Sequence, residues 1–165
     1  MKVGLLMLGA IALTPVAASA HDDAHKQMMQ GMMHGKTEGG HAQGVGKPGD
    51  PKKVSRTIQV LMSDDMKFTP AKVEAKRGET IKFVLRNAGR IKHEMIIGSM
   101  EELKQHAELM RRMPGMEHEE PNQMTLDPGK SGELVWQFTK AGTVDFACLQ
   151  PGHFEAGMKG TVLVK

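Results

Sequence analysis

The sequence predicts an all-β domain, either a β-sandwich or a small barrel, that contains one short helix and follows a flexible tail. From Val54 onward, short runs rich in β-branched residues alternate with turn signals, and about seven strands fit into this part of the chain. Before Val54 the chain is rich in Gly, His, Met and charged residues, which cannot bury enough apolar surface to offset the entropy cost of ordering.

The composition excludes several classes of protein. The 165 residues include 22 Lys and Arg and 19 Asp and Glu, which gives a net charge of +3. They contain no basic cluster suited to binding nucleic acid. A single cysteine, Cys148, rules out an internal disulfide and zinc sites that need two or more cysteines. Methionine is unusually common, with 15 Met against 12 Leu, so the predicted function has to account for this excess.

Residues 1–20 have the features of a cleavable export signal. Lys2 provides a positive start, residues 3–16 are largely apolar, and Ala18–Ala20 is a small-residue cleavage site. The apolar stretch is too short to span a membrane, and the cleavage point has no cysteine for a lipid anchor. The alternative is a buried N-terminal helix. We expect a mature periplasmic protein that begins at His21 and has no membrane anchor.

Residues 21–53 form the expected flexible tail, which concentrates side chains able to bind copper. Thioethers suit Cu(I) and imidazoles suit Cu(II). The methionine spacing would also fit a short helix over residues 26–33. The alternative is a solvated leader whose side chains bind nothing. The candidates for auxiliary copper binding in the tail are His21, His25, Met28, Met29, Met32, Met33, His34 and His41.

Residues 54–165 are predicted to form one domain of short strands. The clearest run is Thr80–Arg86, in which the apolar residues Ile81, Phe83 and Leu85 occupy every second position, as in a strand with one buried face. Turn signals rich in Gly, Pro, Asn and Asp separate the runs. The predicted strands are Thr57–Met62, Lys72–Ala75, Thr80–Arg86, Glu94–Ile97, Glu133–Phe138, Thr143–Ala147 and Thr161–Lys165.

One helix is expected within an insertion at about residues 99–124. Ser99 and Glu102 have the spacing of a capping box, with Ser99 as the N-cap. Apolar residues follow at helical spacing until Pro114 and Gly115, and packing is their favoured role. This stripe consists of Met100, Leu103, Ala107, Met110 and Met113. Near its end, Met113, Met116 and His118 are further candidates for auxiliary copper binding.

The segment before the last predicted strand contains the ligands of a redox copper site. Cys148, His153 and Met158 recur at five-residue intervals, and glycines between them allow the loop to fold back. Together with a second imidazole, they form the ligand set of a copper site with two His, one Cys and a weak axial Met.

The second imidazole has to come from elsewhere in the chain. His93 is preferred because it directly precedes a predicted strand, whereas His106 and His118 lie in or beyond the predicted helix. We therefore predict a mononuclear copper centre with the ligands His93, Cys148, His153 and Met158.

Other interpretations of Cys148 stay open at this point. It could be a core thiol beside an unrelated surface histidine, or a nucleophile with His153 as its base. A nucleophilic Cys148 would lack an evident third group to orient its base. A multicopper oxidase is also disfavoured, because such enzymes need His-x-His pairs and the sequence has none. We expect a binding protein rather than an enzyme.

Residues 57–165 resemble the cupredoxins, the small blue-copper fold. The stretch TIQVLMSDDMKFTPAKVEAKRGETIKFVLRNAG is similar to the family's first three strands, HEMII to its first-ligand strand, and TVDFACLQPGHFEAGMKGTVLVK to its ligand loop and final strand. The resemblance implies a Greek-key β-sandwich and a type 1 copper ion on His93, Cys148, His153 and Met158. The loop spacing resembles rusticyanin and auracyanin more than plastocyanin.

Two features depart from the common cupredoxin pattern. Glu94 stands where many members have Asn or Ser, at a position that braces the ligand loops. The Met-bearing insertion and the Met/His-rich tail resemble the periplasmic copper-tolerance cupredoxins of the CopI type. This implies a role in copper tolerance, by binding copper or handling its Cu(I)/Cu(II) conversion. The alternative is an electron carrier. The expected partners are copper ions and a periplasmic redox or copper-transport protein.

Overall fold

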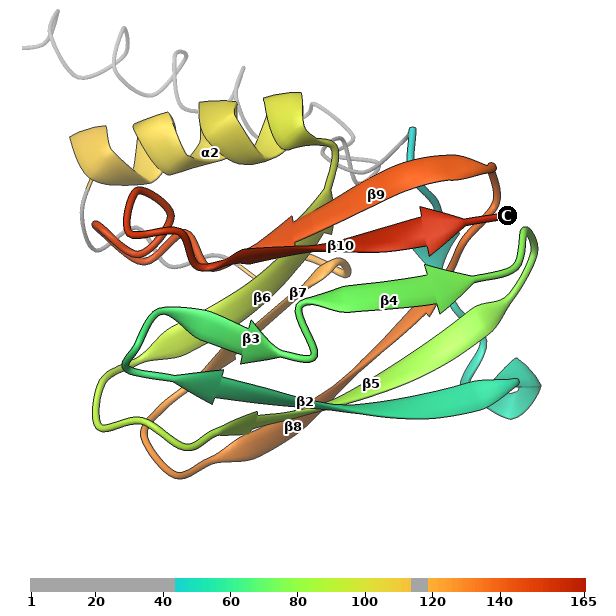
Figure 1. Cartoon of the computed structure of the whole chain (residues 1–165), viewed down its shortest axis with the longest axis horizontal. Helices are drawn as coiled ribbons and strands as arrows, with labels where there is room; N and C mark the ends of the chain where they lie inside the picture. Colours follow the sequence, from blue (N-terminus) through green and yellow to red (C-terminus); the bar gives the residue numbers. More distant parts are fainter. Residues whose placement is uncertain (1–43, 114–118) are drawn as a thin grey trace, which may run out of the picture. The chain divides into compact units, whose positions relative to one another are not determined.

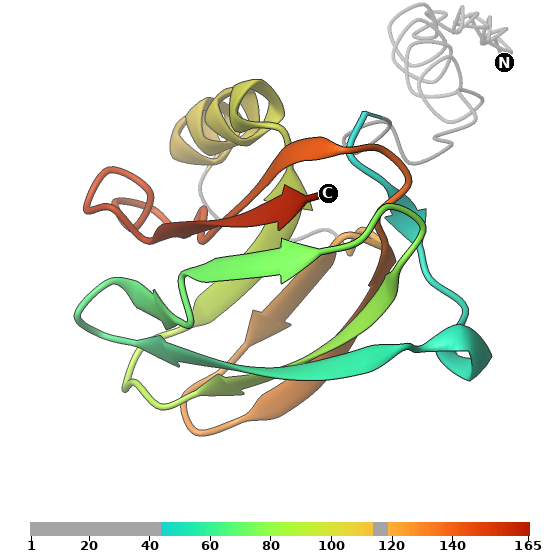
Figure 2. The ribbon, with the colours of Figure 1, turned by 45° about the vertical axis from the view of Figure 1, so that its right-hand side comes forward.

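A computed structural model of the chain describes residues 44–113 and 119–165 (Figure 1). Within these residues ten strands form two five-stranded sheets, which face each other as two layers (Figure 2). The predicted all-β class is confirmed, and the architecture is a sandwich rather than a closed barrel. The expected export signal and residues 21–43 of the expected tail lie outside the described residues.

The first sheet has the strand order β1-β8-β5-β2-β3, with β5 at its centre. The β2–β5 pair is parallel and the other pairs are antiparallel. Ile81, Phe83 and Leu85 of β5 are fully buried, as their alternation predicts. The bounds are β1 Lys47–Pro48, β2 Arg56–Ser63, β3 Lys67–Thr69, β5 Thr80–Asn87 and β8 Ser131–Gln137.

The second sheet has the order β4-β10-β9-β6-β7 and carries the residues of the predicted copper site. The β4–β10 pair is parallel and the other pairs are antiparallel. The adjacency of β6 and β9 matters for the site, because His93 begins β6 and Cys148 directly follows β9. The bounds are β4 Lys72–Ala75, β6 His93–Gly98, β7 Gln123–Leu126, β9 Gly142–Ala147 and β10 Lys159–Val164.

Aromatic side chains fill the space between the sheets. Phe68 and Phe146 pack edge to face with ring centroids 5.1 Å apart, and Phe83 and Phe138 pack similarly at 6.4 Å. Burying each such ring stabilises the fold by roughly 1.5–3 kcal/mol relative to leaving it exposed. This rigid interior supports the strand ends from which the site residues project.

The expected helix is present as α2, Met100–Arg112. Its capping box is complete, because the Ser99 hydroxyl accepts from the Glu102 amide and the Glu102 carboxylate accepts from the Ser99 amide. Leu103 and Ala107 are buried against the second sheet, as predicted, and His106 is buried beside them. The methionines of the stripe pack less than predicted, because Met100 and Met110 are only partly buried and Met113 is 40% exposed. Among the described residues no helix is long and apolar enough to cross a membrane.

Helix α2 buries the second face of β6 (Figure 1). Met95 and Ile97 point into the sandwich core, whereas Ile96 packs with Leu103 and Ala107 of the helix in a separate cluster. All six residues of β6 are therefore buried, including His93 and Glu94. A strand covered on both faces can hold polar side chains away from bulk water only if they find partners.

Three short strands, β1, β3 and β7, are absent from the sequence prediction. Strand β7 lies at the end of the segment expected to be the insertion, and its residues Gln123–Leu126 pair with His93–Ile96 of β6. The Gln-Met-Thr-Leu sequence of β7 is too short to show a period, so only pairing with β6 makes it a strand.

Residues 44–53 differ from the expectation of a flexible tail. Val45 is 7% exposed and belongs to the core cluster, β1 pairs with β8, and a 3₁₀ helix spans Pro51–Lys53. A Cβ on Gly46 would lie only 2.3 Å from Nε1 of Trp136, so this backbone lies directly against the indole. This segment packs on the sandwich because Trp136 offers an apolar surface that the local composition does not reveal.

Candidate metal centre

The three side chains His93, Cys148 and His153 converge at one end of the second sheet. His93 is held by β6, Cys148 follows β9, and His153 belongs to the ligand loop, residues 148–158, which leads into β10. Strands β6 and β9 are hydrogen-bonded neighbours with Ile96 opposite Ala147, so their ends bring His93 and Cys148 together.

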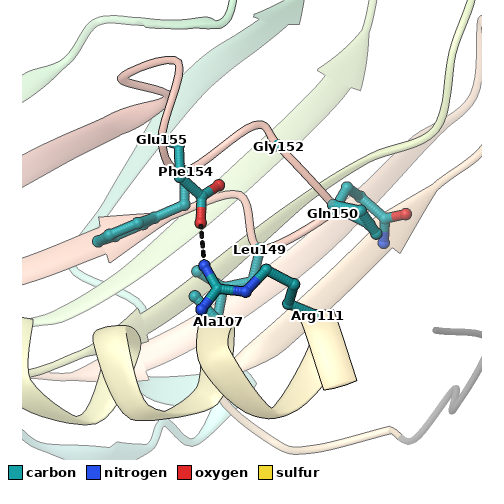
Figure 3. Close-up of a pocket in the computed structure, with 8 residues that line it drawn as sticks. Ala107, Arg111, Leu149, Gln150, Gly152, Phe154 and Glu155 are labelled. Carbon is teal, nitrogen blue, oxygen red and sulfur yellow. Dashed lines mark ion pairs between the residues drawn. The ribbon is translucent and has the colours of Figure 1, made fainter. Parts of the chain in front are cut away.

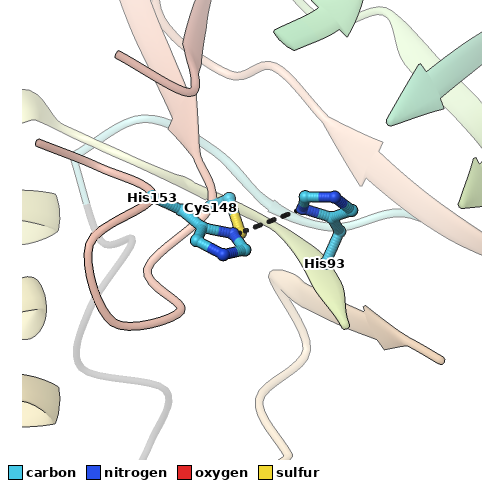
Figure 4. A group of neighbouring side chains, drawn as sticks. All are labelled: His93, Cys148 and His153. Atoms are coloured by element: carbon cyan, nitrogen blue, oxygen red, sulfur yellow. Dashed lines mark hydrogen bonds between the residues drawn. The ribbon is translucent and has the colours of Figure 1, made fainter. Parts of the chain in front are cut away.

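The donor atoms of these residues lie close enough to share one metal ion (Figure 4). The Cys148 Sγ atom is 3.2 Å from Nδ1 of His153 and 4.0 Å from Nδ1 of His93. The two imidazole rings have centroids 4.9 Å apart. One ligand atom from each of the three residues lies within 4.8 Å of the others. His106, the rival imidazole, is buried in α2 and is not a member of this group.

Met158, the expected fourth ligand, is fully buried and belongs to the same core cluster as Cys148. Its backbone N–H donates to the His153 carbonyl at 3.0 Å, and its carbonyl accepts from the Cys148 N–H at 3.1 Å. These bonds close the ligand loop so that its two ends meet. The expected turn is also observed, because Gly152 and Gly157 have φ values of +84° and +95°, which favour glycine.

The ligand loop rests on α2 (Figure 3). Phe154 packs against the cluster that contains Leu103 and Ala107, and Nζ of Lys159 lies 4.6 Å from the centroid of its ring. Glu155 of the loop faces Arg111 of the helix at 3.9 Å. A groove of about 250 Å³ separates the two elements beside these contacts. Helix α2 of the insertion therefore packs against the ligand loop and stabilises its position.

Glu94 ties the ligand loop to β7. The side chain is only 2% exposed, and its Oε1 accepts from the Leu149 amide at 3.0 Å. Its Oε2 accepts from the side chains of Gln150, Gln123 and Thr125 at 3.1 to 3.3 Å. The Glu94 amide also points at Cys148 Sγ, at 3.5 Å. The carboxylate thus braces the loop at the position where many cupredoxins have Asn or Ser, and this network could not be read from the sequence.

Asp64 is a neighbour of the site that the sequence analysis missed. Its Oδ1 lies 3.1 Å from Nε2 of His93, and both of its oxygens accept from the Arg90 amide, at 2.8 and 3.1 Å. A Cβ on Gly89 would lie 1.9 Å from Asp64 Oδ1, so glycine is needed for this approach. No periodicity marks Asp64, because its contact with His93 joins a turn to the start of β6, far away in the sequence.

Hydrogen bonding to Asp64 selects the form of His93 that can bind a metal. An ionised carboxylate only accepts, so the proton of a neutral His93 sits on Nε2 and its Nδ1 lone pair faces Cys148. The bonds from the Arg90 amide, assisted by His93, hold the pKa of Asp64 below its ordinary value and so keep it ionised.

Burial dominates the ionisation of the other two residues. It raises the pKa of Cys148 to about 12, and it lowers the pKa of His153, which the nearby His93 lowers further. At neutral pH the metal-free centre therefore presents a protonated thiol and a neutral imidazole. A metal cation has to displace the thiol proton on binding. A thiol with so high a pKa also lacks the activation that a nucleophilic cysteine needs.

The donor set fits copper. A sulfur ligand suits Cu(I), two imidazole nitrogens suit both oxidation states, and the buried surroundings exclude water from the pair Cys148 and His93. When copper is bound, it supplies one-electron chemistry that none of these side chains provides by itself.

A family model of copper-binding proteins, the plastocyanin/azurin family, matches residues 55–165. The chain belongs to this family. It is also 46% identical over 170 residues to the copper-resistant cuproprotein CopI of Rubrivivax gelatinosus, covering 100% of this chain and 97% of the relative. CopI of Vibrio cholerae is 39% identical, covering 93% of this chain and 94% of the relative. The predicted resemblance to CopI-type cupredoxins is confirmed, and copper is the cofactor of this cupredoxin.

Solved structures support the fold of this cupredoxin. Auracyanin B superposes with a TM-score of 0.60 at 19% identity, covering 73% of this chain and 96% of auracyanin. The reduced auracyanin of Roseiflexus castenholzii superposes with a TM-score of 0.56 at 21% identity, covering 68% and 98% of the two chains. The Greek-key sandwich inferred from the family resemblance is thereby confirmed.

Of the auxiliary copper candidates, the structure describes Met113 alone. Met113 caps the C-terminal end of α2, where it is 40% exposed. Met116 and His118 lie outside the described residues, as do all eight candidates of the tail. Their copper binding stays a prediction from residue chemistry.

Proposed function

We propose that this cupredoxin holds one type 1 copper ion through His93, Cys148, His153 and Met158, and that it protects the periplasm against excess copper. The observation that carries the proposal is the convergence of Sγ of Cys148 with Nδ1 of both histidines within 4.8 Å. Relatives that match almost their whole length are named copper-resistant cuproproteins, which supports tolerance as the role.

Protection can proceed by sequestering copper or by handling its Cu(I)/Cu(II) conversion at this centre. The mixed sulfur and nitrogen donors bind both oxidation states, so the site suits a metal that cycles between them. We also propose that residues 1–20 direct export and are removed, that residues 54–165 are the core of the copper domain, and that the chain binds copper without acting as an enzyme.

The tail and the end of the insertion would add weaker copper sites. Eight His and Met side chains of residues 21–43, together with Met113, Met116 and His118, would capture copper ions before they reach Cys148. This placement would also account for much of the excess of methionine over leucine. A periplasmic redox or copper-transport protein would then receive the metal or the electron.

One spectrum tests the centre itself. Adding Cu(II) to the mature protein should produce an intense thiolate-to-copper charge-transfer band, and Cys148→Ser should abolish it. Circular dichroism of Cys148→Ser should match the wild type, which would show that the loss is not caused by unfolding. A colourless wild-type complex with Cu(II) would overturn the ligand assignment.

An electron carrier is the second candidate, and one observation favours it. His153 is partly exposed whereas His93 is fully buried, so an electron could enter the centre through the His153 ring. Copper tolerance of a deletion strain separates the two roles. Loss of tolerance supports protection, whereas unchanged tolerance together with rapid reduction by a periplasmic donor supports electron transfer.

A further inference from the structure

We propose that Asp64 and Glu94, two carboxylates that do not bind the metal, set the oxidation state preferred by the centre by stabilising Cu(II) relative to Cu(I). The inference rests on the proposed copper site. Both residues are positioning residues, because each acts through a neighbour of the copper ligands. The contacts that carry the inference run through two different ligands, through His93 for Asp64 and through Cys148 and its loop for Glu94.

Asp64 acts through His93. Its Oδ1 accepts the Nε2 proton at 3.1 Å, and His93 is completely buried. A carboxylate behind a ligating imidazole fixes the ring orientation and makes the other nitrogen a stronger donor, which favours the more highly charged metal ion. Two features hold Asp64 in place, namely the Arg90 amide on both oxygens and the free space left by Gly89.

Glu94 acts through the backbone of the ligand loop. Leu149, Gln150 and Gln123 offer it N–H groups, which can only donate, and the Thr125 hydroxyl also donates. A carboxylate surrounded by donors is the acceptor-only, ionised form. The charge sits beside Cys148, because Leu149 follows that residue and the Glu94 amide faces its sulfur at 3.5 Å. Burial leaves this charge poorly screened by solvent.

The net effect follows from the charges around the metal. Cu(II) bound to one thiolate keeps one formal positive charge, which the two carboxylates stabilise. Reduction removes that charge and leaves both carboxylates uncompensated, so Cu(I) is disfavoured. The Arg90 side chain lies 3.8 Å from Asp64, but it is 95% exposed. Water screens its charge, so it does not neutralise the effect of Asp64 on the centre.

The test is the midpoint potential of copper in the mature protein, measured for the wild type, Asp64→Asn and Glu94→Gln. Asparagine can still accept a hydrogen bond from His93, so Asp64→Asn removes mainly the charge. In each variant we expect the ratio of Cu(II) affinity to Cu(I) affinity to fall by about tenfold or more. Each tenfold fall in this ratio raises the midpoint potential by about 59 mV, because the couple transfers one electron. The double variant should show a larger rise than either single variant.

The chain provides matched controls. Asp65→Asn removes the neighbouring carboxylate, which pairs with Lys67 at 3.2 Å, and Glu133→Gln removes a carboxylate of β8 that pairs with Lys82 at 3.1 Å. Among the described residues, neither of these carboxylates forms a hydrogen bond with His93 or Cys148. Both control variants should therefore keep a midpoint potential near the wild-type value. Gly89→Ala should raise the potential, because the added Cβ would lie 1.9 Å from Asp64 Oδ1 and 3.1 Å from Nε2 of His93 and would break their hydrogen bond without removing a charge.

Two failures can be told apart. A wild-type protein without the thiolate-to-copper band would refute the proposed copper site. A normal band, with potentials for Asp64→Asn and Glu94→Gln no higher than those of the two controls, would overturn the role of the carboxylates alone. If Glu94→Gln does not fold, Asp64→Asn and Gly89→Ala decide the question, because both alter a turn at the surface.

Discussion

At the scale of the residue, Cys148 combines full burial with an ionisable thiol. The pKa of the thiol is raised to about 12, mainly by desolvation; the Glu94 amide acts to lower it and the Glu94 charge to raise it. A thiol in this setting stays protonated until a cation replaces the proton. The centre is therefore built to be reactive toward metal and inert as a nucleophile.

This shift predicts how the stability of the metal-free protein depends on pH. Below pH 9.0, the ordinary pKa of a thiol, Cys148 stays protonated in both the folded and the unfolded protein, so it adds no pH dependence to the stability. Between 9.0 and about 12 only the unfolded state releases it, so the free energy of unfolding should fall by about 1.4 kcal/mol per pH unit. Urea unfolding at pH 8 to 11 measures this slope. Cys148→Ser, which cannot ionise, is the control, and parallel curves for the two proteins would contradict the shift.

At the scale of the element, α2 supports the ligand loop from outside the sandwich. Leu103 and Ala107 share a cluster with Leu149, which follows Cys148, and Phe154 of the loop packs on that cluster. The helix therefore stabilises the loop through apolar contacts that are independent of the metal. Its capping box gives it a defined start next to β6, so the helix and the His93 strand are positioned together.

Two leucines of α2 provide a matched comparison. Leu103 is 1% exposed and Leu109 is 40% exposed. Leu103→Ala should lower the free energy of unfolding by about 2–5 kcal/mol, because it leaves a cavity beneath the ligand loop. Leu109→Ala should change it by no more than about 0.5 kcal/mol. Urea unfolding of the metal-free variants measures both, and equal effects would contradict the packing of α2 on the sheet.

At the scale of the whole molecule, the copper domain begins earlier than its composition suggests. Val45 enters the core, and Gly46 lies against Trp136. Residues 44–53 therefore contribute to the stability of the sandwich, whereas residues 21–43 are proposed to contribute only auxiliary copper ligands. Two truncations of the mature protein separate these contributions.

Removing residues 21–43 should leave the Cu(II) band and the unfolding temperature unchanged while lowering the number of Cu(I) ions bound. Removing residues 21–53 should also cost about 1.5–3 kcal/mol of stability from the lost burial of Val45. Calorimetric Cu(I) titration and urea unfolding measure the two effects. An unchanged Cu(I) stoichiometry would remove the tail from the proposal, and equal stability of both truncations would contradict the packing of residues 44–53.

Much of the molecule could be predicted because its signals are local. The alternation in β5 and the capping box at Ser99 arise within a few residues, and both are present in the structure. Strand β7 and the packing of residues 44–53 were missed, because they depend on pairing with β6 and β8 rather than on their own sequence.

Residue types and their spacing were enough to predict the fold class, the helix after Ser99 and the choice of Cys148, His153 and His93 as neighbours, because these features depend on local patterns. Which carboxylates surround these three residues depends on the packing of distant segments. Asp64 reaches His93 across 29 positions, and Glu94 accepts from Leu149 across 55. Such contacts form only when β6, β9 and the turns are packed together, and no local pattern encodes a hydrogen bond between segments that distant.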